Sequence, residues 1–404
     1  MPYALLDLDV TRPLPEVALA PDEDGLAVLV RRRGQPVGFW LEPLAPGRRL
    51  TRAELEGRVA REMGEKLVRE ALREELAAPP AADGFPSLTV AVCTKDRPEM
   101  LARCLASLQP LRGPASAPAF EVLVVDNATS DDRTRAAAAA AGVRYAAEPR
   151  PGLDFARNRA VEEARGDLLA FLDDDVVVDA GWLDGLRAAW AACPDAGGFT
   201  GQVLPYELET PAQVLFERGG GFRRGFERVV FGPPAPDDAI YPCGVGVFGT
   251  GANMAFRRDV LRDLGGFDEA LDTGGPLPGG GDHDIFYRVV RAGHPFVYDP
   301  AYLVFHEHRR DLDALRRQYW SWGASVMAFA VKHHRTDRPQ RRRLRRLVRW
   351  WFGDQARRFG RSVRGQHALP ARMVVAELAG GVQGLLGEYD RSVRRTDRIR
   401  EAHQ

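Results

Sequence analysis

Three consecutive carboxylates, Asp173, Asp174 and Asp175, end an apolar run that begins at Leu168. A continuous apolar run of this length is typical of a buried strand in a parallel sheet. Adjacent carboxylates repel one another unless a cation or a polar ligand takes up the charge, and a hard divalent metal that also holds phosphate oxygens is the simplest such partner. The pattern therefore predicts a metal site at a strand end; a solvated acidic turn is the alternative.

Polar side chains end two further expected strands, with Thr94 after residues 88–93 and Asp126 after residues 120–125. The segments between the strands have helical spacing, with expected helices over residues 98–108, 130–142 and 154–164. Strands that alternate with helices predict an α/β fold with a mostly parallel sheet covered on both faces. Ligands of such sheets bind at the carboxyl ends of the strands, where these polar residues fall.

Composition places the chain among globular proteins without a global charge signal. Its 404 residues are 45% hydrophobic, and 56 basic residues balance 56 acidic ones. The four cysteines are scattered without a Cys-x-x-Cys pair, which favours a reducing cytoplasm over a disulfide framework or a zinc knuckle. The N-terminus lacks the pattern of a signal peptide, and no run of about 18 apolar residues occurs. We expect a cytoplasmic protein that does not span a membrane.

The chain divides into three expected parts. Residues 1–80 predict a small α+β domain with an antiparallel sheet and one helix, residues 87–310 the α/β domain, and residues 311–404 a basic helical region. The segment from Arg335 to Arg364 contains twelve arginines and two aspartates, a local net charge of 12 − 2 = +10.

The Arg-rich helix in that region admits two interpretations. Leu344, Leu347, Val348 and Trp351 recur at helical spacing among arginines, as in a helix that lies on anionic lipid at the inner face of the cell membrane. The alternative is a helix that packs on the rest of the protein and keeps a solvated charged face. We do not expect a nucleic-acid partner, because no recognised binding motif accompanies the charge.

Seven short motifs follow one another along the α/β part of the chain. They are Leu88-Thr-Val-Ala-Val-Cys-Thr-Lys-Asp-Arg-Pro98, Val124-Val-Asp-Asn-Ala-Thr-Ser-Asp131, Gly152-Leu-Asp-Phe-Ala-Arg-Asn158, Phe171-Leu-Asp-Asp-Asp175, Gly249-Thr-Gly-Ala-Asn-Met-Ala-Phe-Arg257, Gly265-Gly-Phe-Asp-Glu269 and Gly280-Gly-Asp-His-Asp284. They occur in the order seen in family 2 glycosyltransferases, which the chain resembles over about residues 87–310. The resemblance implies the GT-A fold, a nucleotide-diphosphate sugar donor, Mg2+ or Mn2+, and inversion at the anomeric carbon during transfer to a hydroxyl.

The resemblance assigns the donor side of the site. Asp175 is expected to bind the metal with help from Asp173, which also faces the donor. His306 is a third candidate ligand, with a structural or phosphate-contacting role as the alternative. The remaining donor-binding candidates are Thr94, Asp126 and Arg157.

On the acceptor side, Asp282 is the expected catalytic base, held as the N-cap of the helix that follows. The alternative is that Asp282 is only a cap and that Asp284 is the base. Asn253 and Asp284 are further acceptor-side candidates. The family often has Glu immediately before this Asp, where the present chain has Gly281.

The resemblance therefore implies an inverting, metal-dependent glycosyltransferase, with cell envelope polysaccharide synthesis as one setting. The acceptor is left open among polysaccharide, lipid-linked and natural-product hydroxyls. Gly281 motivates a rival, a non-catalytic sugar-nucleotide or glycan binder on the same fold. A nucleotidyltransferase is a third hypothesis, against which the motif that ends at Asp284 argues.

Overall fold

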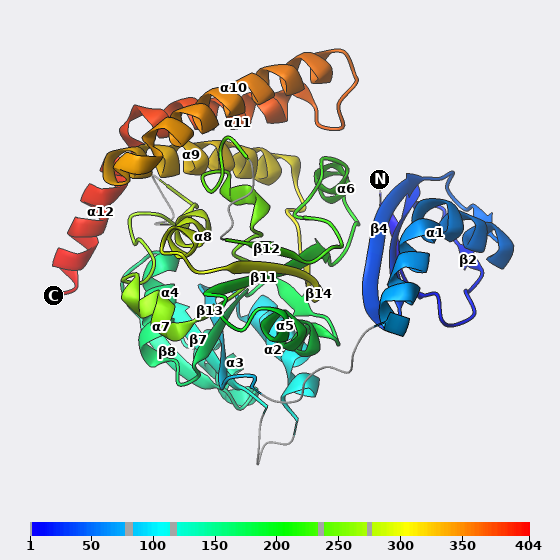
Figure 1. Cartoon of the computed structure of the whole chain (residues 1–404), viewed down its shortest axis with the longest axis horizontal. Coiled ribbons are helices and arrows are strands. Elements are labelled where there is room, and N and C mark those ends of the chain that lie inside the picture. Colours follow the sequence, from blue (N-terminus) through cyan, green and yellow to red (C-terminus); the bar gives the residue numbers. More distant parts are fainter. Residues whose placement is uncertain (1, 77–83, 114–118, 233–237, 273–276) are drawn as a thin grey trace.

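The fold is built around a central mixed sheet (Figure 1). The structure is a computed structural model and describes residues 2–76, 84–113, 119–232, 238–272 and 277–404. The strand order is β10-β14-β11-β13-β9-β6-β7-β8, and β12 pairs with β14. The strands are β6 Leu88–Thr94, β7 Glu121–Asn127, β8 Arg144–Glu148, β9 Leu168–Asp173, β10 Val176–Val178, β11 Gly198–Pro205, β12 Val229–Phe231, β13 Asn253–Arg257 and β14 Phe296–His306.

The four strands β9, β6, β7 and β8 are parallel, so their carboxyl ends meet at one edge. β13 runs antiparallel to β9, and β11 is antiparallel to β13 but parallel to β14. The parallel half follows from the alternation of apolar strands with helices in the sequence. β13 instead reverses direction, which its sequence does not reveal.

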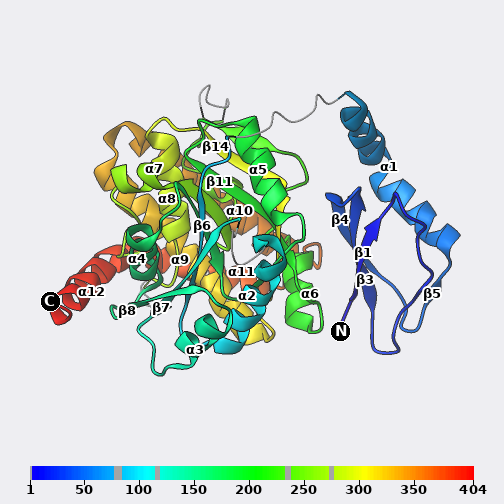
Figure 2. The same cartoon turned by 90° about the horizontal axis from the view of Figure 1, so that it is seen from below.

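Helices cover both faces of this sheet, as the two views show (Figures 1 and 2). One apolar core forms under α2 and α5, and another forms under α4, α7 and α8. The expected α/β fold class is confirmed. The helices are α2 Pro98–Arg112, α3 Arg133–Ala140, α4 Leu153–Glu163, α5 Trp182–Ala192, α6 Pro211–Arg218, α7 Arg258–Asp263 and α8 Gly281–Arg291, with a 3-10 turn at Val245–Val247.

The N-terminal residues form a three-stranded sheet backed by one long helix. Its strands are β1 Ala4–Asp9, β3 Gly25–Arg32 and β4 Gln35–Pro43; β2 Val17–Ala18 pairs with β5 Arg49–Leu50, and α1 spans Arg52–Leu76. The expected antiparallel sheet is wrong in one respect, because β1 pairs with β3 in parallel. The expected boundary near residue 80 lies outside the described residues.

The N-terminal sheet packs against the α/β domain through β4 (Figure 2). Leu29 and Phe39 share an apolar cluster with Leu303 of β14. Beside the cluster, Arg31 forms a buried ion pair with Asp179, at 2.5 Å.

Four helices make up the C-terminal region. Of these, α9 lies next to α8, α10 and α11 lie beyond α9, and α12 extends to one side (Figure 1). They are α9 Leu312–Thr336, α10 Arg341–Val363, α11 Ala371–Gln383 and α12 Tyr389–Ala402, with a 3-10 turn at Arg338–Gln340 and a π-helical segment at Gly384–Glu388. Asp311 caps α9, accepting the N–H of Ala314 at 2.7 Å. Within the described residues, none of the helices combines the length and apolarity that a membrane span requires.

The apolar stripe of α10 faces the protein. Leu344, Leu347 and Trp351 are buried, and the Trp351 ring lies against Gly381 of α11. The interpretation in which this stripe contacts lipid is therefore wrong, because the stripe is used for packing between helices.

Candidate functional site

The ends of β6 and β9 bring Thr94 to the acidic run, as the parallel sheet predicts. The Thr94 hydroxyl donates to Asp174 Oδ2 at 2.6 Å, and Arg97 Nη1 lies 3.2 Å from Asp174 Oδ1. Asp174 is thus held by these two residues and turned away from its neighbours. In this structure Thr94 hydrogen-bonds to Asp174 of the acidic run. Its expected contact with a nucleoside stays a proposal.

Asp173, Asp175 and His306 form a cluster whose nearest ligand atoms all lie within 4.8 Å of one another. His306 ends β14, and the pairing of β10 with β14 carries it to the acidic run. Its Nε2 lies 3.2 Å from Asp175 Oδ1. Two carboxylates and one imidazole are a suitable donor set for a divalent ion.

Electrostatics at this cluster favour a bound cation. Burial and then the charge of Asp175 raise the pKa of Asp173 to about 6. Burial also lowers the pKa of His306 to about 3, so that its imidazole is neutral. Asp175 Oδ1 is buried and has no hydrogen-bond partner among the described residues, although it faces His306. An orphaned carboxylate oxygen opposite a neutral imidazole nitrogen fits a divalent metal ion between them.

Asp126, at the end of β7, presents one carboxylate oxygen without a hydrogen-bond partner within the described part of the chain. Its other oxygen accepts the Tyr145 hydroxyl at 2.9 Å, and burial raises the pKa of the carboxyl. The free oxygen is available to an N–H or hydroxyl of a ligand.

Arg157, on α4, lies among four carboxylates from four different segments. Its Nη1 donates to Asp154 Oδ1 at 2.9 Å and to Asp272 Oδ2 at 3.1 Å. Burial lowers the pKa of the guanidinium, but the charges of Asp154, Asp272, Asp173 and Asp282 outweigh it and raise the pKa above its ordinary value. Arg157 is therefore a fixed cation between the acidic run and Asp282.

Asp282 is half-buried in the first turn of α8, and backbone donors hold both of its oxygens. Oδ2 accepts the N–H of Gly251 at 3.0 Å, and Oδ1 accepts the N–H of His283 at 2.8 Å. Burial raises the pKa of Asp282, but His283, Arg157 and these backbone N–H groups outweigh it and lower the pKa. The expected N-cap role is wrong, because the cap residue is Gly280, with φ of 109°.

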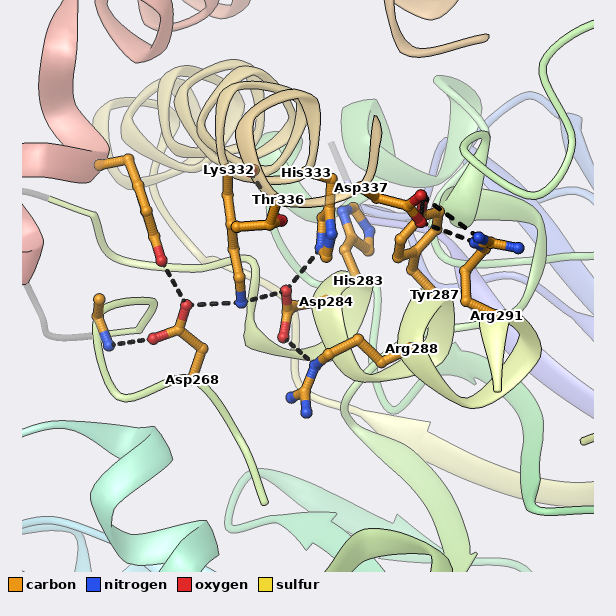
Figure 3. A network of polar contacts seen from close by, with 12 residues as sticks. Asp268, His283, Asp284, Tyr287, Arg288, Arg291, Lys332, His333, Thr336 and Asp337 are labelled. Atoms are coloured by element: carbon orange, nitrogen blue, oxygen red, sulfur yellow. Dashed lines mark hydrogen bonds and ion pairs between the residues drawn. The ribbon is translucent and has the colours of Figure 1, made fainter. Parts of the chain in front are cut away.

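Asp284 faces the opposite way, into a buried network with the C-terminal helices (Figure 3). Its carboxylate contacts Arg288 Nε at 2.7 Å, His333 Nε2 at 2.8 Å and the Lys332 ammonium. Although burial raises the pKa of Asp284, the charges of Lys332 and Arg288 outweigh it and hold the pKa far below its ordinary range. Lys332 also bridges to Asp268. The acceptor-side assignment of Asp284 is therefore corrected: the residue ties α8 to α9.

The acceptor-side assignment of Asn253 is also corrected. It is fully buried, its amide nitrogen donates to the carbonyl of Tyr302 at 2.7 Å, and its oxygen accepts the indole N–H of Trp182 at 3.1 Å. Both ends of the amide are satisfied inside the sheet, so Asn253 holds strands together.

Gly281 has no room for a side chain because Asp154 occupies that space. A Cβ built on Gly281 would lie 2.0 Å from Asp154 Oδ2. Asp154 is fully buried, burial raises its pKa well above the ordinary value, and Oδ2 has no hydrogen-bond partner among the described residues. A carboxylate thus stands beside Gly281, although it comes from α4.

Sequence reasoning gave no role to Asp154, Asp272, Arg97 or Arg309. Arg97 and Arg309 lie 3.5 and 4.0 Å from Asp175 Oδ2 and contribute positive charge at the acidic run. Arg97 lies in the motif Leu88 to Pro98 and Asp154 in the motif Gly152 to Asn158. Their positions in these motifs were the sequence signal that could have marked them as functional. No comparable signal marks Asp272.

Comparison with known proteins supports a family assignment. Residues 89–265 match the model of the family described as Glycosyl transferase family 2. The pre-mycofactocin glycosyltransferase of Mycobacterium tuberculosis is 27% identical over 328 residues, 77% of this chain and 64% of the relative. The succinoglycan biosynthesis protein ExoM of Rhizobium meliloti is 37% identical over 222 residues, 53% of this chain and 64% of the relative. The chain thus spans about 64% of the length of these curated relatives.

The likeness to a solved structure is weaker. The mannosyltransferase PcManGT from Pyrobaculum calidifontis, in complex with GDP-Man and Mn2+, is 18% identical with a TM-score of 0.46, covering 81% of this chain and 97% of that chain. The family match and the curated relatives support a glycosyl transferase family 2 domain at residues 89–265.

Proposed function

We propose that this protein is an inverting, metal-dependent glycosyltransferase that moves a sugar from a nucleotide-diphosphate donor to a hydroxyl acceptor. The observation that carries the proposal is the orphaned Asp175 Oδ1, 3.2 Å from the neutral His306 nitrogen. Asp173, Asp175 and His306 would hold Mg2+ or Mn2+. When bound, the ion would neutralise the diphosphate that leaves the sugar.

Donor binding in this proposal falls to the edge of the parallel strands. The free oxygen of Asp126 would accept a hydrogen bond from the nucleoside, with Thr94 at the neighbouring strand end. Arg157 would pair with the diphosphate, since guanidinium groups bind phosphate oxygens in a fixed geometry.

Asp282 would take the proton of the acceptor hydroxyl as the sugar is transferred. Its lowered pKa keeps it ionised at neutral pH, and the two backbone N–H groups fix its position. A base on the acceptor side and a metal on the leaving-group side are what direct displacement with inversion requires.

The argument for a non-catalytic binder, which was the missing carboxylate at position 281, is weakened. Gly281 is the only departure that prompted it, and the carboxylate of Asp154 fills the space beside that glycine. The acceptor class stays open among polysaccharide, lipid-linked and natural-product hydroxyls, because the relatives named above differ in the compound that they name.

Asp154→Ala is expected to weaken donor binding about tenfold or more, because a charge-assisted hydrogen bond that orients Arg157 contributes roughly 1.5–3 kcal/mol. Donor affinity by calorimetry checks this. Combining Asp154→Ala with Gly281→Glu is expected to recover part of the loss, since the second change returns a carboxylate to the vacated space. A double variant no better than Asp154→Ala would show that Asp154 does not stand in for a carboxylate at position 281.

We further propose that the outer face of α10 attaches the protein to the inner face of the cell membrane. Four exposed arginines in the first half of α10 form no ion pair within the described residues, and Trp350 beside them is 51% exposed. Helical spacing puts them opposite the buried stripe of Leu344 and Leu347. These arginines are Arg342, Arg345, Arg346 and Arg349.

Replacing those four arginines by Gln is expected to abolish salt-sensitive cosedimentation with anionic liposomes. Each arginine near anionic lipid contributes about 1 kcal/mol, so the loss is roughly a thousandfold in partitioning. The matched control removes four exposed arginines from the N-terminal part of the chain, Arg12, Arg33, Arg49 and Arg61. Equal binding by both variants, or no binding by the wild type, would reject the membrane role.

A further inference from the structure

Behind the Asp173, Asp175 and His306 cluster lies a buried chain of hydrogen-bonding groups that no catalytic step uses. His306 Nδ1 is 3.1 Å from His308 Nδ1, and His308 Nε2 is 2.8 Å from Glu217 Oε1. Glu217 comes from α6, so the chain joins α6 to the end of β14. The side chains of His308 and Glu217 are 1% and 0% exposed.

The polarity of these hydrogen bonds follows from which groups can donate. A carboxylate only accepts, so His308 must place its proton on Nε2 to donate to Glu217. If this is the only ring proton of His308, its Nδ1 is an acceptor. His306 must then donate from Nδ1, and its Nε2 keeps a free lone pair directed at Asp175.

Aromatic packing keeps both rings in this orientation. The Phe216 ring lies 4.7 Å from the His308 ring, and the Phe222 ring lies 5.2 Å from the His306 ring, measured between centroids. Arg223 Nε lies 3.1 Å from Glu217 Oε2 and offsets the buried charge of Glu217. The carboxylate is therefore fixed at the far end of the chain.

We propose that His308, which Glu217 holds in place, is a positioning residue of the metal site: its Nδ1 sets the tautomer and ring orientation of His306 so that His306 Nε2 is ready to bind the ion. This inference rests on the proposed metal-dependent function. Hydrogen-bonded partners of ligating histidines typically change metal affinity 10- to 100-fold when removed.

The test is a pair of substitutions at His308 with Mn2+ titrated into donor-free protein by calorimetry. His308→Leu removes the acceptor of the His306 proton and is expected to weaken Mn2+ binding about 10- to 100-fold. His308→Asn places an amide oxygen near the former Nδ1 position and is expected to bind Mn2+ nearly as the wild type does. Equal weakening in both variants, or wild-type affinity in both, would overturn the positioning role.

A second readout needs no metal. Long-range 15N–1H spectra of the metal-free protein are expected to show His306 as the Nδ1–H tautomer in the wild type and in His308→Asn. An Nε2–H tautomer in the wild type would overturn the assignment. This measurement also holds if His308→Leu folds poorly.

Two controls separate this inference from the proposed function. His333→Leu removes another buried histidine, bonded to Asp284 rather than to the cluster, and is expected to leave Mn2+ affinity unchanged. If the wild type binds no Mn2+, or Asp175→Asn binds it equally well, the metal site itself fails. If the wild type binds Mn2+ and His308→Leu binds it equally well, only the positioning role fails.

Discussion

Asp282→Asn is expected to lower the rate of sugar transfer by about 10²- to 10⁴-fold, roughly 3 to 5 kcal/mol of barrier, while donor affinity changes little. The amide cannot take the acceptor proton, and its single oxygen can accept only one of the two N–H groups, from Gly251 and His283, that hold Asp282. Because Asp282 is not a helix cap, the expected loss of stability is limited to about 1 kcal/mol for the other hydrogen bond. Transfer rate, donor affinity and melting temperature measured on one preparation check all three statements.

The contrasting substitution is Asp284→Asn, two residues away on the same helix. It leaves the cations Arg288 and Lys332 without their buried counter-charge, which costs about 3–5 kcal/mol of folding free energy. Its expected signature is a lowered melting temperature with transfer retained in the folded fraction. Near-wild-type transfer by Asp282→Asn, together with collapse in a folded Asp284→Asn protein, would move the base to Asp284.

The second large effect is expected from Asp175→Asn, which should abolish metal-dependent transfer and weaken Mn2+ binding beyond detection. Asp175 supplies the orphaned oxygen of the cluster, and an amide there brings no charge to offset the ion. The fold should survive, because the change removes one of the mutually repelling carboxylates at the end of β9. Calorimetric titration with Mn2+ and transfer assays with and without chelator check this expectation.

Asp259→Asn is a matched control for that experiment, since this carboxylate is exposed on α7 and lies outside the cluster. It should behave as the wild type in both assays. Full activity of Asp175→Asn in the presence of chelator would remove Asp175 from the proposed metal site.

Most of the parallel half of the sheet was predictable because β6, β7 and β9 are apolar runs that each end in polar residues. Thr94, Asp126 and Asp173 come together at the carboxyl edge through strand register alone. His306 could be placed beside them only through resemblance, because the antiparallel pairing of β10 with β14 that brings it there leaves no mark in the sequence.

The acceptor side was harder to predict, because the wrong assignments there depend on the direction in which a side chain points. Asp282 and Asp284 are two positions apart, and two steps along a helix turn a side chain by roughly 200°, so only one can face the site. Asn253 lies in a motif, but sequence cannot tell an amide that binds a ligand from one that joins strands. The contact of Asp154 with Gly281 spans 127 residues, and it appears only when α4 and α8 pack together.

The most direct test of the account is nucleoside diphosphate release from a panel of UDP-, GDP- and dTDP-sugars, with simple hydroxyl acceptors, in the presence and absence of Mn2+. We expect at least one donor to release its nucleoside diphosphate only when the metal is present. NMR should show that the product has the inverted anomeric configuration. The Asp282→Asn variant should leave this donor unconsumed. Donors that bind without release of nucleoside diphosphate would instead make the protein a non-catalytic binder. Pyrophosphate release from a nucleoside triphosphate and a sugar phosphate would make it a nucleotidyltransferase, and either result would contradict the proposed function.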